Sequence, residues 1–349
     1  MFNVVFIVFA CKNKDAAENS VWKTCPTQSR SWNGVPDSEF GFRLQAAEEQ
    51  VWITAPQDCD TPLYILEEEG INPQSWSLEN CTDRVGQEIT VNKNDVWLYA
   101  PIQQQWLSMN ESTSVNGRRL SFTPTDKKVL LTDSSLTIGE VIHPLPKSAI
   151  DLTLYGERPA VLLRGLPTQI WTEDGIHIPL RDADDRSDEQ IERSLYNRIH
   201  PFLQDVNGKN RWVLGGGEQL TYLQEDTLYT VSLPHSSILQ SDISEHHRIS
   251  MGYASSIGNY DNDVHLDWIV GAPTAGSGQT LDFPEQAGWV GWFERVNGSW
   301  ILQKEWVGSE AFAHLGMSVS FFTTPTERRI IAGSPGLDQI DQLHCLQKD

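Results

Sequence analysis

A short apolar segment that ends in a small or turn-forming residue recurs along the whole chain, and this repetition constrains the fold more than any other feature. The two clearest copies are residues 267–273 (DWIVGAP) and residues 329–335 (RIIAGSP), each preceded by a segment in which a glycine stands among apolar residues. Residues 51–56 (VWITAP) and 96–101 (VWLYAP) are two further copies. One structural unit is therefore predicted to be used several times along the chain.

The best copies carry a Gly-Ala-Pro sequence at residues 271–273, and Phe40-Gly41 stands before the first copy. In these features the chain resembles the FG-GAP repeat family, which is found at the head of integrin α subunits. Weaker copies at residues 128–132, 160–165 and 211–215 bring the number of repeats to seven. The resemblance implies a closed ring of seven blades.

Each repeat has room for four strands. Residues 288–295 and 300–307 are two alternating or aromatic runs that follow one of the apolar copies, and the turn signal Asn297-Gly298 separates them. A four-stranded blade cannot cover its own apolar faces, so blades must stack around a common axis. We therefore predict an all-β fold, a seven-bladed β-propeller of the FG-GAP type with blades of four antiparallel strands.

The N-terminal region predicts export from the cytoplasm. Residues 1–11 are almost wholly apolar and end in Val8-Phe9-Ala10-Cys11, which resembles a bacterial lipobox with Cys11 as the lipidated residue. An ordinary signal peptide is the alternative. Residues 12–20 form a polar tether, and residues 21–349 form the propeller domain. We expect an outer-membrane or cell-surface lipoprotein, with a periplasmic or secreted protein as the alternative.

The cysteines are consistent with an oxidising compartment. Without Cys11 four remain, an even number that suits two disulfides, and three pairings are possible in principle. The last repeat has room for only a third strand, at residues 342–347, so residues 20–25 are expected to supply its outer strand. The N- and C-terminal strands then share the last blade. That closure places Cys25 beside Cys345 and leaves Cys59 to pair with Cys81 in the first blade.

Composition limits the class of partner. The formal net charge of −21 opposes binding to nucleic acid and to anionic lipid, so contact with a membrane is expected only through the lipid anchor. Hydrophobic residues make up 39% of the chain and include 13 Trp, which indicates a folded core rather than an acidic disordered chain.

The sixth repeat contains a loop that could hold a hard cation. Residues 259–267 place oxygen-bearing side chains at loop positions 1, 3, 5 and 9, and Ca²⁺ prefers such ligands. The spacing matches the calcium loop of FG-GAP repeats, although Asn259 replaces the usual Asp and Val264 replaces the usual Gly. An ordinary polar hairpin loop is the alternative. The resemblance implies one structural Ca²⁺ ion held by the side chains of Asn259, Asp261, Asp263 and Asp267 and by the carbonyl oxygen of His265.

The sequence predicts a binding protein. The longest insertions, residues 181–200 and 274–287, fall on the face opposite the calcium loop, and we expect a protein or glycan ligand there, as in adhesion or receptor proteins. The alternative is a structural subunit of a cell-envelope assembly. No nucleophile motif, phosphate loop or paired-acid motif stands in a suitable context, so no enzyme is expected. An enzyme with a site in the central channel would need acids or histidines clustered from several inner strands.

Overall fold

The computed structural model gives an all-β fold, and no helix among its described residues is long and apolar enough to span a membrane. The structure describes residues 22–26, 30–47, 49–58, 60–68, 70–74, 84–92, 95–110, 113–155, 157–164, 169–178, 181–182, 198–200, 212–216, 220–224, 227–231, 233, 249–263, 265–276 and 283–348.

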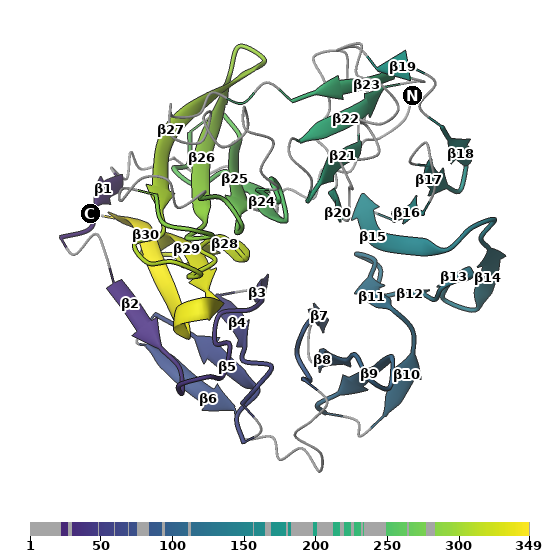
Figure 1. The fold of residues 1–349 in the computed structure, drawn as a ribbon, viewed down its shortest axis with the longest axis horizontal. Coiled ribbons are helices and arrows are strands. Elements are labelled where there is room, and N and C mark those ends of the chain that lie inside the picture. Colours follow the sequence, from purple (N-terminus) through teal and green to yellow (C-terminus); the bar gives the residue numbers. More distant parts are fainter. Residues whose placement is uncertain are drawn as a thin grey trace, which may run out of the picture.

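Seven antiparallel sheets stand around a common axis as the blades of a propeller (Figure 1). Blade 1 consists of β3 (Leu44–Ala47), β4 (Gln50–Thr54), β5 (Leu63–Leu66) and β6 (Ile71–Gln74). Blade 2 consists of β7 (Ile89–Asn92), β8 (Asp95–Ala100), β9 (Gln105–Ser108) and β10 (Ser114–Asn116). Blade 3 consists of β11 (Arg119–Phe122), β12 (Lys128–Leu131), β13 (Ser135–Ile138) and β14 (Val141–Pro144).

The remaining blades follow the same plan with additions at two edges. Blade 4 consists of β15 (Ala149–Tyr155), β16 (Arg158–Leu163), β17 (Gln169–Thr172) and β18 (Gly175–His177). Blade 5 consists of β20 (Arg198–His200), β21 (Trp212–Gly215), β22 (Thr221–Gln224) and β23 (Thr227–Thr230), with β19 (Arg181–Asp182) added in parallel to β23. Blade 6 consists of β24 (Ala254–Gly258), β25 (Asp267–Ala272), β26 (Trp289–Val296) and β27 (Ser299–Val307). Blade 7 consists of β28 (Ser318–Thr323), β29 (Glu327–Ser334), β30 (Gln339–Lys348), β1 (Trp22–Thr24) and β2 (Arg30–Asn33), with a 3₁₀ turn at Pro335–Leu337 between β29 and β30.

The predicted fold is confirmed. Every one of the seven apolar copies becomes the second strand of its blade, and these strands are buried because neighbouring blades cover both of their faces. The hairpin between β26 and β27 turns at Asn297 and Gly298, which both have positive φ, as a two-residue turn of this kind requires.

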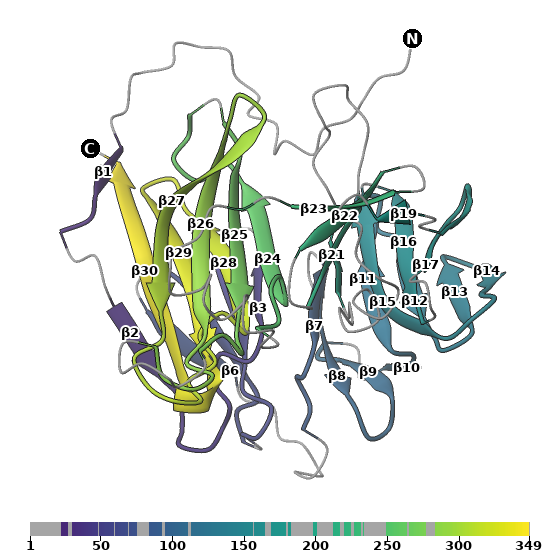
Figure 2. The same ribbon diagram turned by 45° about the horizontal axis from the view of Figure 1, so that its top comes forward.

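The first and last strands of the described chain lie in blade 7, as predicted. Strands β1 and β2 both pair with β30, and Trp22 is opposite Lys348 (Figure 2). Cys25 and Cys345 form a disulfide with a Cα–Cα distance of 5.4 Å, and the amide of Cys25 donates a hydrogen bond to the carbonyl of Cys345. The predicted pair Cys59 and Cys81, and the lipidation site Cys11, lie outside the described residues.

Glycines of the repeat mark the places where consecutive blades touch through their backbones. A Cβ atom on Gly271 would overlap with the carbonyl of Gly316 in the next blade, and a Cβ on Gly333 would overlap with that of Gly41. The amide of Gly316 in turn donates to the carbonyl of Gly333, at 3.1 Å. The glycines therefore recur because the ring leaves no space for a side chain at these contacts.

We expect Gly271→Ala to lower the free energy of unfolding by roughly 1–3 kcal/mol, because the added methyl group must push apart the backbones of two blades. Urea denaturation measures this loss. Gly258→Ala is the matched control, since its Cβ would meet only the movable ring of Phe321, at 3.3 Å. Equal stability of the two variants would contradict a tight contact at Gly271.

Candidate functional site

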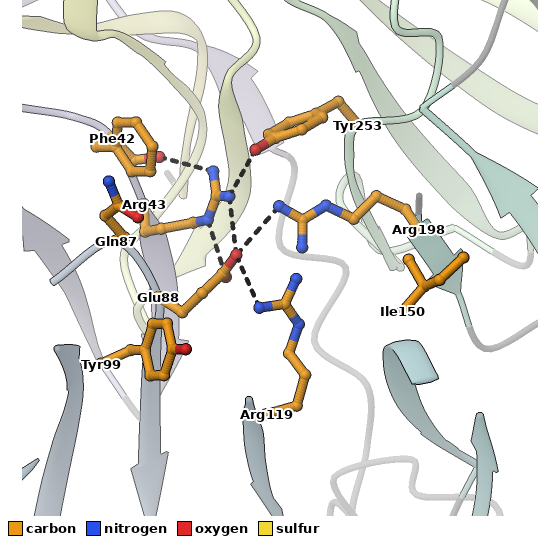
Figure 3. A pocket seen from close by; sticks show the side chains of 9 residues that line it. All are labelled: Phe42, Arg43, Gln87, Glu88, Tyr99, Arg119, Ile150, Arg198 and Tyr253. Atoms are coloured by element: carbon orange, nitrogen blue, oxygen red, sulfur yellow. Dashed lines mark hydrogen bonds and ion pairs between the residues drawn. The ribbon is translucent and has the colours of Figure 1, made fainter. Parts of the chain in front are cut away.

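Four charged side chains and one tyrosine meet on the axis of the ring, at the end where the innermost strands begin (Figure 3). They come from five blades, each from a residue that opens an innermost strand or directly precedes it. We call this group the axial cluster. It consists of Arg43, Glu88, Arg119, Arg198 and Tyr253.

Glu88 is the centre of the axial cluster. Its carboxylate accepts two hydrogen bonds from Arg43, from Nε and Nη2, both at 3.0 Å. Arg198 Nη2 donates to the same carboxylate at 3.1 Å, and Arg119 Nη1 forms an ion pair with it at 3.4 Å. Three guanidinium groups from three blades thus converge on one carboxylate (Figure 3).

A second carboxylate, that of Asp151 in β15, contacts two arginines of the axial cluster. Asp151 accepts a hydrogen bond from Arg119 Nε at 2.7 Å and one from the amide of Ile199 at 3.0 Å. Arg198 Nη1 lies 3.8 Å from the same side chain. The buried Nε of Arg198 has no acceptor within the part of the chain that the structure describes. Three arginines against two carboxylates leave one excess positive charge on the axis of a chain with net charge −21.

The arginines set the ionisation of their neighbours. Burial alone would raise the pKa of Glu88, but Arg119, Arg198 and Arg43 hold it well below its usual range. Burial also raises the pKa of Tyr253, and Arg43 and Arg198 lower it by more, so that it lies below that of a free tyrosine. Glu88 is therefore ionised at neutral pH, and Tyr253 is more acidic than a free tyrosine.

Two cavities adjoin the axial cluster, with volumes of about 290 and 300 Å³. The five cluster residues line both cavities, so the cluster separates one from the other. Phe42, Tyr99 and Ile150 add aromatic and apolar surface to the first cavity, and Gln87 adds an amide. Because the innermost strands begin here, this cavity opens toward the face that carries the loops between second and third strands, which we call the front face.

The predicted calcium loop lies at the opposite end of blade 6, between β24 and β25. Asp267 accepts hydrogen bonds from the amide of Tyr260 at 2.6 Å and from Trp292 Nε1 at 2.7 Å. Asp261 accepts from the amide of Asp263 at 3.2 Å, and Asp263 accepts from the amide of His265 at 2.6 Å. These hydrogen bonds tie the three aspartates to the backbone of one loop.

Asn259 is also part of this loop, but its amide nitrogen donates to the carbonyl of Asp263 at 2.5 Å. Arg328 of the next blade binds the carbonyls of Asn259 and Tyr260, at 3.1 and 2.9 Å. Burial raises the pKa of Asp267 to about 6. The loop thus holds the carboxylates of Asp261, Asp263 and Asp267 close together, in partly buried surroundings.

Sequence reasoning missed Glu294, which approaches the loop from β26. Its carboxylate, a carboxylate oxygen of Asp263 and a ring nitrogen of His265 all lie within 4.8 Å of one another. Burial, together with Asp263 and Asp261, raises the pKa of Glu294. The oxygen-rich donor set fits a hard divalent cation, since such a cation would offset the crowding of negative charge.

Sequence reasoning also missed the axial cluster. A signal was present in the first three repeats, where a charged residue stands two positions after a glycine at the start of the innermost strand. These pairs are Gly41 with Arg43, Gly86 with Glu88, and Gly117 with Arg119.

The chain shares its fold with proteins of diverse function. Virginiamycin B lyase from Staphylococcus aureus matches with a TM-score of 0.56 and 12% identity, over 91% of this chain and 98% of the lyase. A streptogramin B lyase structure matches with a TM-score of 0.57 and 10% identity, over 92% and 98% of the two chains. U3-55K matches with a TM-score of 0.55 and 10% identity, over 94% and 100%. No family model matches the sequence, and no curated protein has significant sequence similarity to it.

The prediction that the chain is not an enzyme is wrong as it was reasoned. Lyases are among the proteins that share this fold, so a propeller gives no ground for excluding catalysis. The prediction also relied on the absence of catalytic motifs, whereas charged side chains from separate repeats stand at the beginning of the innermost strands. Acids and arginines from several blades do meet in the channel.

Proposed function

We propose that this protein binds an acidic glycan at the axial cluster, with a sugar carboxylate held by Arg119 and Arg198. The observation that carries the proposal is the convergence of three arginines beside a cavity of about 290 Å³, with an unpartnered buried N–H on Arg198 among the described residues. Guanidinium groups form strong, directional hydrogen bonds with carboxylates, and partial burial strengthens them.

The other groups in the channel favour a sugar over a simple carboxylate. Glu88 and Asp151 only accept hydrogen bonds when ionised, so a ligand that fits beside them also carries O–H donors. Phe42, Tyr99 and Tyr253 offer aromatic surface to the same cavity. A uronic acid combines a carboxylate, hydroxyl groups and an apolar ring face.

The ligand would arrive on the front face. This is the face on which the sequence places the long insertions, opposite the calcium loop, although residues 183–197 and 277–282 of these insertions lie outside the described residues. Long loops on a rigid scaffold are common recognition surfaces. An acidic protein segment is the competing ligand, and it would present a carboxylate without the hydroxyl groups.

We expect the protein to bind an oligogalacturonate and to lose roughly 10- to 150-fold in affinity for the fully methyl-esterified oligomer, since a hydrogen bond to a charged group contributes about 1.5–3 kcal/mol. Isothermal titration calorimetry at two salt concentrations measures both affinities. A poly-glutamate peptide forms the second arm. Equal affinity for acid and ester, or tighter binding of the peptide, would contradict the proposal.

We also propose a structural Ca²⁺ ion in the loop of blade 6, with Asp261, Asp263 and Asp267 as carboxylate ligands, completed by Asn259 and the carbonyl of His265. Their placement in one loop supports this, and Glu294, whose carboxylate lies within 4.8 Å of a carboxylate oxygen of Asp263, is near enough to add a further oxygen. The ion would stabilise the hairpin by neutralising its crowded charges.

Chelation should therefore lower the melting temperature by a few degrees, and added Ca²⁺ should restore it. A ligand present at 100 times its Kd stabilises a fold by about 2.7 kcal/mol. Differential scanning calorimetry with EDTA and Ca²⁺ checks this, and Asp261→Asn should abolish the response. The exposed Asp174→Asn is the control and should keep it. An unchanged melting temperature in wild-type protein would rule out a stabilising ion.

We further propose an extracytoplasmic protein of the FG-GAP type, anchored through a lipid on Cys11. The Cys25–Cys345 disulfide supports an oxidising compartment. The glycine contacts between blades support the repeat type, because they occur at the Gly of Phe-Gly and at the Gly of the second motif. Metabolic labelling with a fatty acid, compared between wild type and Cys11→Ala, would test the anchor.

A further inference from the structure

Two cations lie against Tyr253, one of them hydrogen-bonded to its phenol oxygen. Arg43 Nη2 donates a hydrogen bond to this phenol oxygen at 2.9 Å. The guanidinium carbon of Arg198 lies 4.5 Å from the centre of the tyrosine ring, and that of Arg43 lies 5.0 Å away. A donor on the phenol oxygen and a second positive charge over the ring stabilise the phenolate over the phenol.

Other groups around Tyr253 leave it as the best proton acceptor in the cavity. Glu88 is held ionised by the arginines and is a weak base. Burial raises the pKa of Tyr99. His200 Nε2 must donate its proton to the carbonyl of Gly252, at 2.7 Å, and burial lowers its pKa. Asp151 is bound by Arg119 and by the amide of Ile199.

We infer that Tyr253 is the proton acceptor in a β-elimination that cleaves the acidic glycan bound at the axial cluster. The inference rests on the proposed function and adds a reaction to it. A carboxylate held by Arg119 and Arg198 would place the neighbouring carbon of the sugar close to Tyr253, which lines both cavities. Arginines that bind the carboxylate also stabilise the negative charge that develops when this carbon loses its proton.

The reaction needs no oxidant and no second substrate. The Tyr253 phenolate takes the proton from the carbon that carries the carboxylate, and the two electrons of that C–H bond form a double bond to the next ring carbon. The bond from that ring carbon to the glycosidic oxygen breaks, and the oxygen leaves with the bonding electrons. The proton on Tyr253 passes to the leaving oxygen, which restores the phenolate. The products are a shortened glycan and an unsaturated uronate.

The test uses the full protein with oligogalacturonate. We expect a rise in ultraviolet absorbance from the conjugated product in wild-type protein. Tyr253→Phe should lower kcat by roughly 10²- to 10⁴-fold, the usual contribution of an acid–base group, with binding of the oligomer preserved. Tyr229→Phe, on the outer strand of blade 5, is the matched control and should retain wild-type kcat.

A pH profile separates a chemical role from a structural one. Glu88 opposes the ionisation of Tyr253, whereas Arg43 and Arg198 favour it. Glu88→Gln should therefore shift the acidic limb of the kcat profile to lower pH, measured where the variant is folded. Binding without unsaturated product, or equal kcat in Tyr253→Phe, would overturn this inference and leave the proposed function standing. Failure to bind the oligomer at all would overturn both.

Discussion

Glu88→Gln should lower the free energy of unfolding by about 3–5 kcal/mol, the usual cost of removing one partner from a buried group of charges. The substitution keeps the size of the side chain but removes the charge that Arg43, Arg119 and Arg198 share. Only Asp151 would remain to balance three guanidinium groups, whose side chains are only 12–22% exposed.

The comparison is made by urea denaturation at neutral pH. Glu140→Gln is the control, because Glu140 is exposed, and it should change stability by less than about 0.5 kcal/mol. If Glu88→Gln were as stable as the control, the arginines would not depend on Glu88 for their charge balance.

The difference in the free energy of unfolding between wild type and Glu88→Gln should change with pH in a defined direction. The pKa of Glu88 is lower in the folded state than in the unfolded state, where it is about 4.3. The stabilising contribution of its charge is therefore fully present above that value and is lost as pH falls toward the folded pKa. The gap in stability between wild type and Glu88→Gln should thus persist at neutral pH and shrink in acid.

Removal of the disulfide should have a comparable effect. The bond joins residues 320 positions apart. Closure of so long a loop destabilises the unfolded chain by about 6 kcal/mol in the entropic account, and measured values for disulfides are typically about 2–4 kcal/mol. It also ties the three-residue strand β1 to β30, where blade 7 closes the ring.

The double variant Cys25→Ala, Cys345→Ala should therefore unfold at a lower temperature and at a lower urea concentration than wild type. Thr24→Ala is the control, since it alters an exposed side chain in the same strand and leaves the bond intact. A double variant with wild-type stability would mean that the hydrogen bonds of β1 and β2 hold the ring closed without the bond.

The sequence predicted the fold well because the ring repeats its most buried element. Each second strand is a continuous apolar run, covered on both faces by its neighbours, and such runs are visible without knowledge of their partners. The glycines were visible for the same reason, since every contact between consecutive blades requires the same close approach. The closure of blade 7 followed from counting strands.

The axial cluster could not be predicted in the same way. Arg43, Glu88, Arg119 and Arg198 are at least 31 residues apart in sequence, and each by itself resembles an ordinary surface charge. Only closure of the ring brings them to one point, so the ion-pair cluster cannot be recognised from any single repeat. Glu294 was missed for a related reason. It lies in β26, and only the folded sheet brings it to the loop that precedes β25.

The most direct test of the account measures how much of the affinity for oligogalacturonate depends on the channel arginines. The affinities for the acid and for its methyl ester are compared in wild type, in Arg198→Gln and in the exposed control Arg158→Gln. We predict that the acid-to-ester ratio falls toward one in Arg198→Gln and stays at its wild-type value in Arg158→Gln. An unchanged ratio in folded Arg198→Gln would contradict carboxylate binding at the axial cluster.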